Sequence, residues 1–528
     1  MFRVLLIQPA IEDFFFTPAR SYPLGLLSLA TVLEQAGFQV RILNSVASPT
    51  RRTVPIPFEL AYARQYYQPN QSAFRLFSGY YRFGADDAYV GNEIRSFAPH
   101  IVGISLNFTA YLDSGFRLAR LIKQIDSRIT IVAGGRAATA QPALVMRNAA
   151  FEYLIRGEAE FSLRELCLGL RRGESLKRIA GLCLRRPDGS AQISRRVALI
   201  KDLNRLPPIN HALIDVVPYK FQGRSLASLL ASRGCALGCS FCAIQERFRF
   251  RGIESIVKEM EQGYSRGIRH FNFEDDTINL HPQFEQLLDA IHARFKDTIR
   301  ISFMNGLLSR GLTSRIVAKL SIAGLTHADF SVGSMVPRLR KDMNRREDAR
   351  QIFQAAKRLQ KHNIPSTVHY IIGYPGQTFN YAVRDIRELA QEPVLLGPSI
   401  FYPVPGSAIF PRIAHHYQAE NSYRLMRSSA ASFTQDIPRD RLMTLLYLSR
   451  VVNAIKEELD KTGKGPKGPE WEALFKQHKI CRVVKNNDKQ PELIPEEFVR
   501  PENVRAILHN LEICSLKGKK FRVPVRLK

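Results

Sequence analysis

The chain has 528 residues, of which 45% are hydrophobic and 23% are charged, a composition typical of a globular protein with more than one domain. No run approaches the roughly 20 apolar residues of a membrane span, and the first residues predict a β-strand instead of a signal peptide, so we expect a cytoplasmic location. The net charge of +28 is spread along the chain and ends in a basic C-terminal run, so it allows an anionic partner without favouring nucleic acid.

Predicted strands and helices alternate over residues 1–170. Short apolar runs predict buried strands at 2–7, 38–43, 100–106, 129–135 and 151–157, with helices at 24–36, 112–125 and up to residue 169. This alternation indicates an α/β domain with a doubly wound parallel sheet, which binds ligands at the carboxyl ends of its strands. An aromatic-rich insertion at about residues 46–90 carries no assignable pattern.

A second α/β region begins after a predicted β-hairpin at 185–194 and a proline-containing linker, which together occupy residues 171–224. Further strands are predicted at 225–232, 270–275, 300–305, 327–333, 366–373 and 398–403, with helices at 253–266, 283–295, 313–323, 346–362 and 379–391. Six β/α units indicate a partial (β/α)6 barrel over 225–412, with its chemistry on loops at the strand ends. Residues 413–528 predict a mainly helical region, a break rich in Gly, Pro and Lys at 462–469, and a basic tail.

Three of the seven cysteines fall within eight residues, directly after the first predicted barrel strand. The seven cysteines are too few and too unevenly placed for a disulfide framework, whereas the thiolates of Cys235, Cys239 and Cys242 on one loop can hold a soft metal centre. Gly234 and Gly238 give the loop the freedom to wrap around it. Zinc needs a fourth ligand that no nearby CxxC or HxxxH motif supplies, whereas an iron–sulfur cluster with one exogenous ligand does not. Both metals remain open at this point.

The spacing C-x3-C-x2-C after the first strand of a β/α barrel resembles the radical S-adenosylmethionine (SAM) superfamily, in which three cysteines hold a 4Fe–4S cluster and the open iron chelates SAM. The segments FNFEDDTI, SVGS, YIIGYPGQT and FYPVPGSAIF continue the resemblance over roughly 225–412. It implies that Cys235, Cys239 and Cys242 bind the cluster and that SAM contacts come from Phe241, Glu274, Asp275, Ser331 and Gly333. Met335 departs from the pattern, since many relatives carry a Glu shortly after the Ser-x-Gly of this strand.

The N-terminal pattern resembles the cobalamin-binding domain that is fused to many radical SAM enzymes. Its segments are RVLLIQP, YPLGLLSLATVLEQAGFQVRIL, PHIVGISLNFT and ITIVAGG. In well-known cobalamin binders an Asp-x-His-x-x-Gly loop offers a histidine to cobalt; here Gly25 is kept but Tyr22 occupies the histidine position. The resemblance implies cobalamin beside Tyr22, Gly25, Ser105, Thr109, Gly134 and Gly135, without an imidazole ligand, because His100 lies at the wrong end of its strand. The alternative is a domain that has the fold and no cofactor.

The combined resemblance implies an enzyme that reductively cleaves SAM at a 4Fe–4S cluster and modifies an unidentified substrate. Cobalamin-dependent methylation is the leading interpretation, and a low-potential electron donor of the flavodoxin or ferredoxin type is the expected partner. The alternatives are a radical cyclase or rearrangement enzyme, an RNA methylthiotransferase-like enzyme, and a non-catalytic iron–sulfur scaffold or electron carrier.

Overall fold

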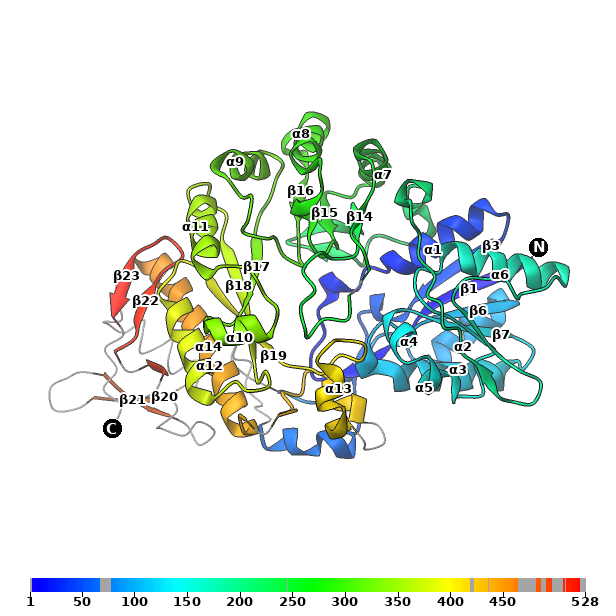
Figure 1. Cartoon of the computed structure of the whole chain (residues 1–528), viewed down its shortest axis with the longest axis horizontal. Helices are drawn as coiled ribbons and strands as arrows, with labels where there is room; N and C mark the ends of the chain where they lie inside the picture. The colour runs from blue at the N-terminus through cyan, green and yellow to red at the C-terminus, as the bar shows by residue number, and fades with distance from the viewer. Residues whose placement is uncertain are drawn as a thin grey trace.

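The computed structural model describes residues 2–66, 77–244, 246–417, 422–434, 436–463, 481–485, 491–495, 507–508 and 510–522 (Figure 1). Part of the predicted insertion, most of the 462–469 break and the last residues of the basic tail lie outside these ranges. Within the described ranges, no helix combines the length and the apolar character that a membrane crossing requires.

The N-terminal region contains a seven-stranded sheet of order β10-β9-β8-β7-β6-β1-β3. The parallel strands are β1 (Arg3–Gln8), β3 (Gln39–Asn44), β6 (Ile101–Ser105), β7 (Thr130–Gly134) and β8 (Tyr153–Ile155). Apolar residues of helices α1 (Leu24–Gln35) and α6 (Glu160–Arg172) pack on one face, and those of α2 (Asp87–Phe97) and α3 (Leu112–Ile125) pack on the other. The predicted doubly wound parallel sheet is therefore confirmed.

The predicted hairpin after this region consists of β9 (Leu182–Arg185) and β10 (Ala191–Gln192). It pairs antiparallel with β8 and so extends the N-terminal sheet. The insertion contributes β4 (Arg51–Thr53) and β5 (Tyr81–Phe83), which form a small antiparallel sheet with β2 (Ile11–Asp13), and the 3₁₀ segment η3 (Phe58–Tyr66). The insertion thus adds a second layer beside the carboxyl end of β1.

The second region is a curled arrangement of parallel strands with helices on its outer side (Figure 1). The strands are β12 (Arg224–Leu229), β15 (His270–Phe273) and β16 (Arg300–Ser302) in one sheet, and β17 (Ala328–Gly333), β18 (Ser366–Ile372) and β19 (Leu395–Ile400) in another. The helices are α7 (Ile253–Ser265), α8 (Phe284–Phe295), α9 (Ser314–Ile322), α11 (Ala349–Gln360) and α12 (Phe379–Ala390), with the short α10 (Pro337–Asp342) after β17.

The predicted partial barrel is confirmed with one difference in its hydrogen bonding. Strands β16 and β17 share no ladder; near this seam a bridge pairs Ile301 of β16 with Leu325, ahead of β17. The short strand β11 (Lys220–Phe221) pairs antiparallel with β12 at the other edge. The barrel is therefore two half-sheets that meet along a seam.

The C-terminal region centres on the long helix α14 (Arg439–Thr462), as the helical pattern predicts. Buried Lys456 of α14 donates hydrogen bonds to the carbonyl oxygens of Leu389, Glu392 and Val394, which caps the end of α12. Two hairpins that the sequence did not predict follow: β20 (Cys481–Lys485) with β21 (Pro491–Pro495), and β22 (Glu512–Cys514) with β23 (Lys520–Arg522).

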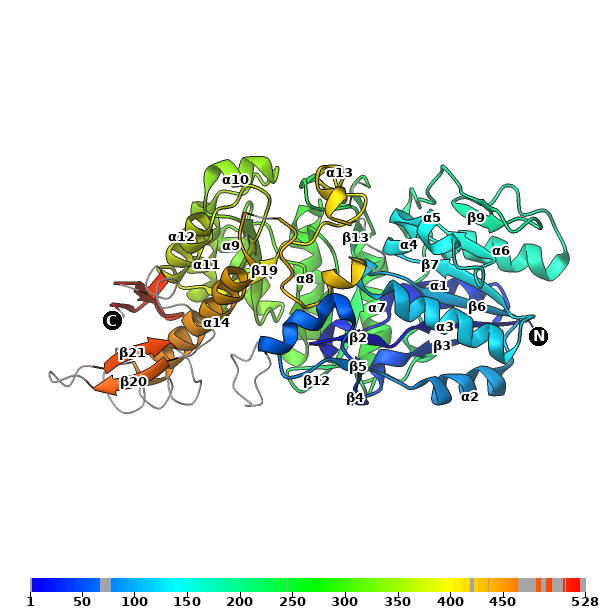
Figure 2. The same cartoon turned by 90° about the horizontal axis from the view of Figure 1, so that it is seen from below.

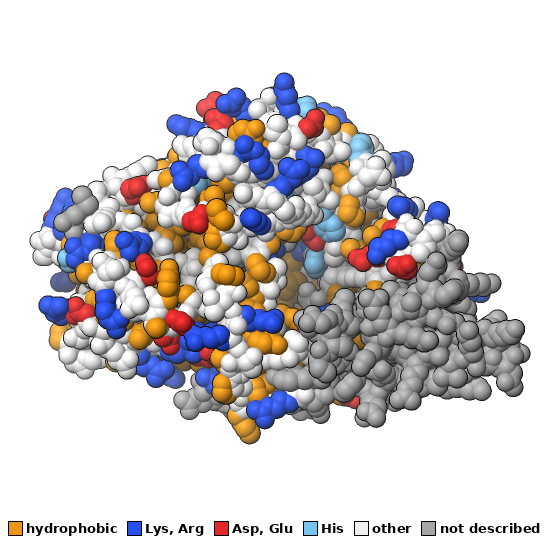
Figure 3. Space-filling model, turned by 180° about the vertical axis from the view of Figure 1, so that it is seen from behind, with side chains coloured by type: hydrophobic (Ala, Val, Ile, Leu, Met, Phe, Trp, Pro, Cys, Tyr) orange, Lys and Arg blue, Asp and Glu red, His pale blue; other side chains and the backbone are white. Residues whose placement is uncertain are grey.

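One hydrophobic core crosses the junction between the N-terminal region and the barrel, which lie side by side in Figures 1 and 2. It joins Phe14, Tyr22 and Leu27 of the first region to Leu226 and Phe271 of the barrel. Lys and Arg side chains are scattered over the described part of the back face among acidic and apolar side chains (Figure 3), as expected of a solvated surface.

Candidate active site

The carboxyl ends of the two sets of parallel strands face each other. Arg136, just after β7, lies 3.9 Å from the carboxylate of Asp276, just after β15. Arg20, ahead of α1, donates to the Met304 carbonyl and to Asn305 at 2.9 and 2.6 Å, beyond the end of β16. These part-exposed contacts contribute little stability. They do place the ligand-binding edge of the N-terminal sheet opposite that of the barrel.

The cysteine loop opens into this space between β13 (Ser232–Arg233) and β14 (Arg249–Phe250), which pair antiparallel and fix its two ends. Gly234 is required there, because a Cβ would lie 2.4 Å from the Arg247 carbonyl oxygen and φ is +83°. Burial raises the pKa of the Cys235 thiol, and the neighbouring Asp276 and Cys239 raise it further. Burial also raises the pKa of Cys242, and Asp276, Cys239 and Cys235 add to that effect. Cys235 and Cys242 therefore both lie within electrostatic reach of Asp276 and of Cys239.

Arg345 connects this loop to the end of β17. Its guanidinium donates to the Ser331 carbonyl at 2.7 and 2.9 Å, pairs with Glu347 at 2.9 Å and lies 3.6 Å from Cys239 Sγ. Glu347 in turn accepts from the backbone and hydroxyl of Ser309. Sequence reasoning missed Arg345, because a charged run such as NRREDAR gives no signal that separates a buried arginine from solvated ones.

The three acids after β15 have different environments. Asp275 is buried and accepts hydrogen bonds from the Ala231 amide at 3.0 Å and from the Ser232 hydroxyl, so it holds the chain where the cysteine loop begins. Glu274 accepts from Asn272 Nδ2 at 2.6 Å and from Ser228 at 3.3 Å, and its side chain stays partly exposed. Asp276 faces Arg136. Of the two acids predicted to contact SAM, Glu274 keeps an exposed surface, whereas the carboxylate of Asp275 is buried and hydrogen-bonded to the backbone and side chain of neighbouring residues.

We expect Asp275→Asn to flatten the pH dependence of stability between 3.8 and about 7. Burial raises the pKa of Asp275 from 3.8 to about 7, against the hydrogen bonds from Ser232 and Ala231. A carboxyl with a raised folded-state pKa stabilises the fold when protonated, and that contribution is lost as the pH rises through about 7. Asparagine does not ionise, so thermal unfolding of the variant should lack this fall. Two pH curves of the same shape would contradict the prediction.

The carboxyl end of β17 packs against Met343 and hydrogen-bonds to Asp385. Gly333 adopts φ +76°, and a Cβ there would lie 2.8 Å from Met343 Sδ. Met335 is buried, and its amide donates at 2.6 Å to Asp385, which also accepts from Ser334 at 2.9 Å. The Met335 side chain thus offers no polar group at this strand end. Phe241 packs against the apolar cluster around Tyr374 and Phe401.

The predicted cobalamin residues Ser105, Thr109, Gly134 and Gly135 lie together at the carboxyl edge of β6 and β7. Asn107 links them: its amide donates to the Ser105 hydroxyl at 3.1 Å, and its oxygen accepts from the Arg136 amide at 3.4 Å. Gly135 has φ +115°, and a Cβ would meet the Leu106 carbonyl at 2.7 Å. Gly25 and Gly134 have no heavy atom within 4 Å of a Cβ position, which leaves open space there.

Comparison with known families gives this geometry its identity. Residues 229–389 match the model of the Radical SAM superfamily, and residues 79–167 match that of the B12 binding domain. The chain therefore contains a radical SAM domain and a B12-binding domain. This confirms both resemblances that the sequence analysis stated.

Two curated relatives of this radical SAM chain are methyltransferases. An uncharacterised methyltransferase of Pyrococcus horikoshii is 28% identical over 295 residues, which are 55% of this chain and 63% of the relative. Cytidylyl-2-hydroxyethylphosphonate methyltransferase of Streptomyces wedmorensis is 24% identical over 73% of this chain and 75% of its own length. The match thus spans less than two thirds of the Pyrococcus protein.

Solved structures show the same fold. The radical SAM methyltransferase TsrM of Kitasatospora setae superposes with a TM-score of 0.61 at 18% identity, over 79% of this chain and 76% of that one. The cobalamin-dependent SAM radical enzyme OxsB gives a TM-score of 0.57 at 14% identity, over 86% of this chain and 62% of that one.

The residues present fit the groups that radical SAM and B12-binding families bring. In the described part of the chain, no three His, Cys, Asp or Glu side chains are gathered to chelate a single ion. A 4Fe–4S cluster instead takes one thiolate on each of three irons, which suits three neighbouring cysteines on one loop. Gly134, the last residue of β7, leaves open space at the sheet edge that faces this loop. The residues expected to hold the cluster, SAM and cobalamin therefore lie on facing strand ends of the two regions.

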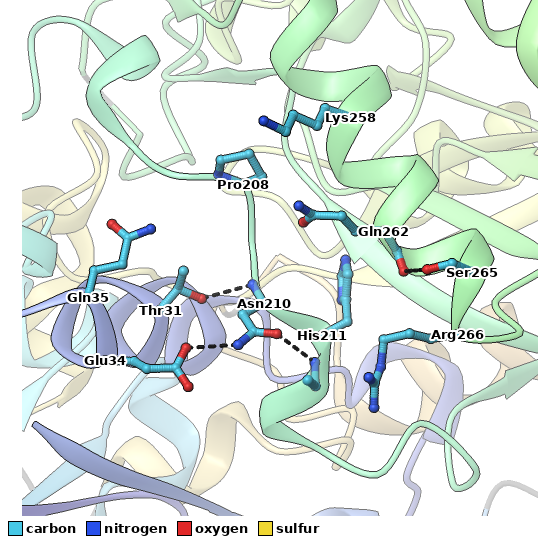
Figure 4. Close-up of a pocket in the computed structure, with 11 residues that line it drawn as sticks. Thr31, Glu34, Gln35, Pro208, Asn210, His211, Lys258, Gln262, Ser265 and Arg266 are labelled. Atoms are coloured by element: carbon cyan, nitrogen blue, oxygen red, sulfur yellow. Dashed lines mark hydrogen bonds between the residues drawn. The ribbon is translucent and has the colours of Figure 1, made fainter. Parts of the chain in front are cut away.

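Tyr22 lies in the core shared by the two regions and not at their facing strand ends. Only 8% of its surface is exposed, and its hydroxyl is 2.6 Å from His211 Nδ1, next to the ring of Tyr219. His211 comes from the linker and lines a pocket of about 450 Å³ between α1 and α7, together with Asn210 and Gln262 (Figure 4). A histidine thus reaches the Tyr22 position from outside the first 200 residues. Tyr22 therefore packs in the core and not at the strand ends where the resemblance implies cobalamin.

Proposed function

We propose that the protein is a cobalamin-dependent radical SAM methyltransferase that acts on an unidentified substrate. The observation that carries the proposal is the pairing of Arg136 with Asp276, since it sets the edge of the B12-binding domain opposite the cysteine loop. A methyl group carried at one edge can then reach a substrate activated at the other. The two methyltransferase relatives support this choice of reaction.

The residues at the facing strand ends each have a role in this proposal. Cys235, Cys239 and Cys242 would hold the cluster, and Arg345 would keep the loop against the end of β17. Phe241, Glu274, Ser331 and Gly333 would border SAM, with Asp275 acting through the loop that it anchors. When bound, the groups supply reductive SAM cleavage and methyl transfer, and the protein supplies position and exclusion of water.

The reaction needs a low-potential electron donor, for which a flavodoxin or ferredoxin is the proposed partner. Radical rearrangement and methylthiotransfer are the alternative outcomes. Relatives of both kinds exist at lower coverage: a ribosomal protein uS12 methylthiotransferase of Synechocystis over 36% of this chain, and an anaerobic magnesium-protoporphyrin IX monomethyl ester cyclase of Synechocystis over 31%. The methyltransferase matches cover more of the chain, and we therefore prefer methylation.

The proposal is tested without knowing the substrate. Protein reconstituted under anaerobic conditions with cluster and cobalamin is given SAM with a deuterated methyl group and a low-potential reductant. We expect mass spectrometry to find 5′-deoxyadenosine and to find the label on cobalamin. Cleavage without any transfer of the label would favour a radical rearrangement. Absence of both products would favour the scaffold or electron carrier.

A further inference from the structure

Two arginines lie directly opposite each other on the two stems of the cysteine loop. The stems β13 and β14 share only two residue pairs, Ser232 with Phe250 and Arg233 with Arg249. A ribbon this short is not stable by itself, and like charges directly across a strand pair repel each other. Both guanidinium side chains are also largely buried. The loop therefore needs an outside group to keep its two ends together.

The B12-binding domain supplies that group in the segment after β8. Glu158 accepts two hydrogen bonds at 2.8 Å from the Arg249 guanidinium, and its carboxylate also lies 3.7 Å from Arg233. Glu160 lies 2.5 Å from Arg233 and accepts from the Ser28 hydroxyl at 2.8 Å. One carboxylate thus faces both arginines, and a second one holds the first stem.

The position of Glu158 is itself fixed by its backbone and by a third donor. Gly157 has φ +92°, and a Cβ there would lie 2.2 Å from the Ala198 carbonyl oxygen. The Glu158 amide donates to the same oxygen at 2.9 Å, and its carboxylate accepts from the Ile200 amide at 2.7 Å. The carboxylate therefore meets the two stems at a defined place.

The charges of this group and the positions of the cluster ligands are linked. Burial raises the pKa of Glu160, but the adjacent Arg233 outweighs burial and holds this pKa below its usual value, so Glu160 is ionised. Cys235 stands two residues after Arg233, and Cys242 stands seven residues before Arg249. Without a carboxylate between them, the buried arginines reach water only if the stems move apart. Such a movement separates Cys235 from Cys242.

We propose that Glu158 and Glu160 are positioning residues for the iron–sulfur cluster, which hold the two stems of the cysteine loop at the separation that three sulfurs on one cluster require. The inference deepens the proposed function, because it needs a cluster at Cys235, Cys239 and Cys242, but it does not need methyl transfer. The B12-binding domain then supports the cluster site in addition to the cobalamin that it is expected to hold.

The first test is the rate at which the reconstituted cluster of Glu158→Gln gives up iron to bathophenanthroline. Glutamine keeps the size of the side chain but removes the charge, so we expect iron release about tenfold faster than from the wild type, at a temperature where circular dichroism shows both folded. The electron paramagnetic resonance spectrum of the reduced cluster should also change less on addition of SAM, since SAM chelation depends on the geometry of the open iron.

A second substitution tests whether repulsion between the arginines is the cause. Adding Arg249→Gln to Glu158→Gln removes one of the two facing charges, so the double variant should release iron more slowly than Glu158→Gln alone. Faster release from the double variant than from Glu158→Gln would overturn the inference.

The matched control breaks another buried ion pair of the B12-binding domain. Asp113 pairs with buried Arg427 at 2.6 Å, and none of the described contacts of these two residues reaches the cysteine loop. Asp113→Asn should lower the melting temperature but keep the iron release and the SAM response of the wild type. Equal iron release from Asp113→Asn and Glu158→Gln would reject a specific role of Glu158.

Glu160→Gln covers the case in which Glu158→Gln does not fold, because it keeps the carboxylate that faces both arginines. It should also release iron faster than the wild type, and release at the wild-type rate from this folded variant would overturn the inference. Failure of the wild type itself to hold a cluster would instead reject the cluster part of the proposed function.

Discussion

Replacing Cys235, Cys239 and Cys242 together by alanine should remove the brown chromophore and abolish SAM cleavage. The wild type should hold about four irons and four sulfides per chain in this site after anaerobic reconstitution. Without the three thiolates, the loop between β13 and β14 offers no sulfur to iron, and no open iron remains to bind SAM. Iron and sulfide analysis, the visible spectrum and chromatography of 5′-deoxyadenosine measure the three losses.

The matched control changes three other cysteines. Cys167, Cys183 and Cys514 are all buried away from the loop. Their replacement by alanine should leave iron content and SAM cleavage intact, at the cost of some stability from small cavities. A full cluster in the first triple variant would refute the ligand assignment. Stoichiometric zinc in the wild type would favour the alternative metal.

Glu259→Ala should destabilise the barrel by about 3–5 kcal/mol. Glu259 of α7 is fully buried and pairs with Arg251 at 2.8 Å, and it also accepts from the Ile209 amide at 3.2 Å. Arg251 donates in turn to the Leu230 carbonyl at 2.9 Å, just ahead of the cysteine loop. The variant leaves a buried guanidinium without its counter-charge, so the loss includes the cost of that unpaired charge.

Glu261→Ala in the same helix is the control for this effect. Glu261 pairs with Arg294, but both side chains are largely exposed, so its loss should cost no more than about 1 kcal/mol. Urea unfolding followed by circular dichroism compares both variants with the wild type. Equal shifts for the two variants would show that burial of the Arg251–Glu259 pair does not decide its contribution.

The strands of both regions could be predicted from sequence because their signal is local. RVLLIQ has four buried apolar residues in succession, and both phenylalanines of HFNF are buried, as is typical of strands covered on both faces. Glycines end several helices between the strands. The cysteine loop was predictable for the same reason, since its spacing and its glycines lie within one short stretch. The seam between β16 and β17 was not, because which strands pair depends on how the whole barrel closes.

The remaining site features depend on contacts between distant segments. His211 reaches Tyr22 across 189 residues, and Arg345 reaches Cys239 across 106, and neither distance leaves a pattern in the sequence. The sequence does not distinguish Asp275 from the acids on either side of it, whereas the contacts to Ala231 and Ser232 bury Asp275.

The core that runs from Phe14 and Leu27 into Leu226 and Phe271 joins the two regions by a continuous apolar contact. A domain that moves between separate sites during a reaction needs a polar interface from which it can detach. Here, separating the two regions would expose a continuous apolar surface to water. The distance between the facing strand ends of the two regions is therefore established once, when the chain folds. In the proposed reaction, substrate and reductant would both approach a junction whose two sides stay in place.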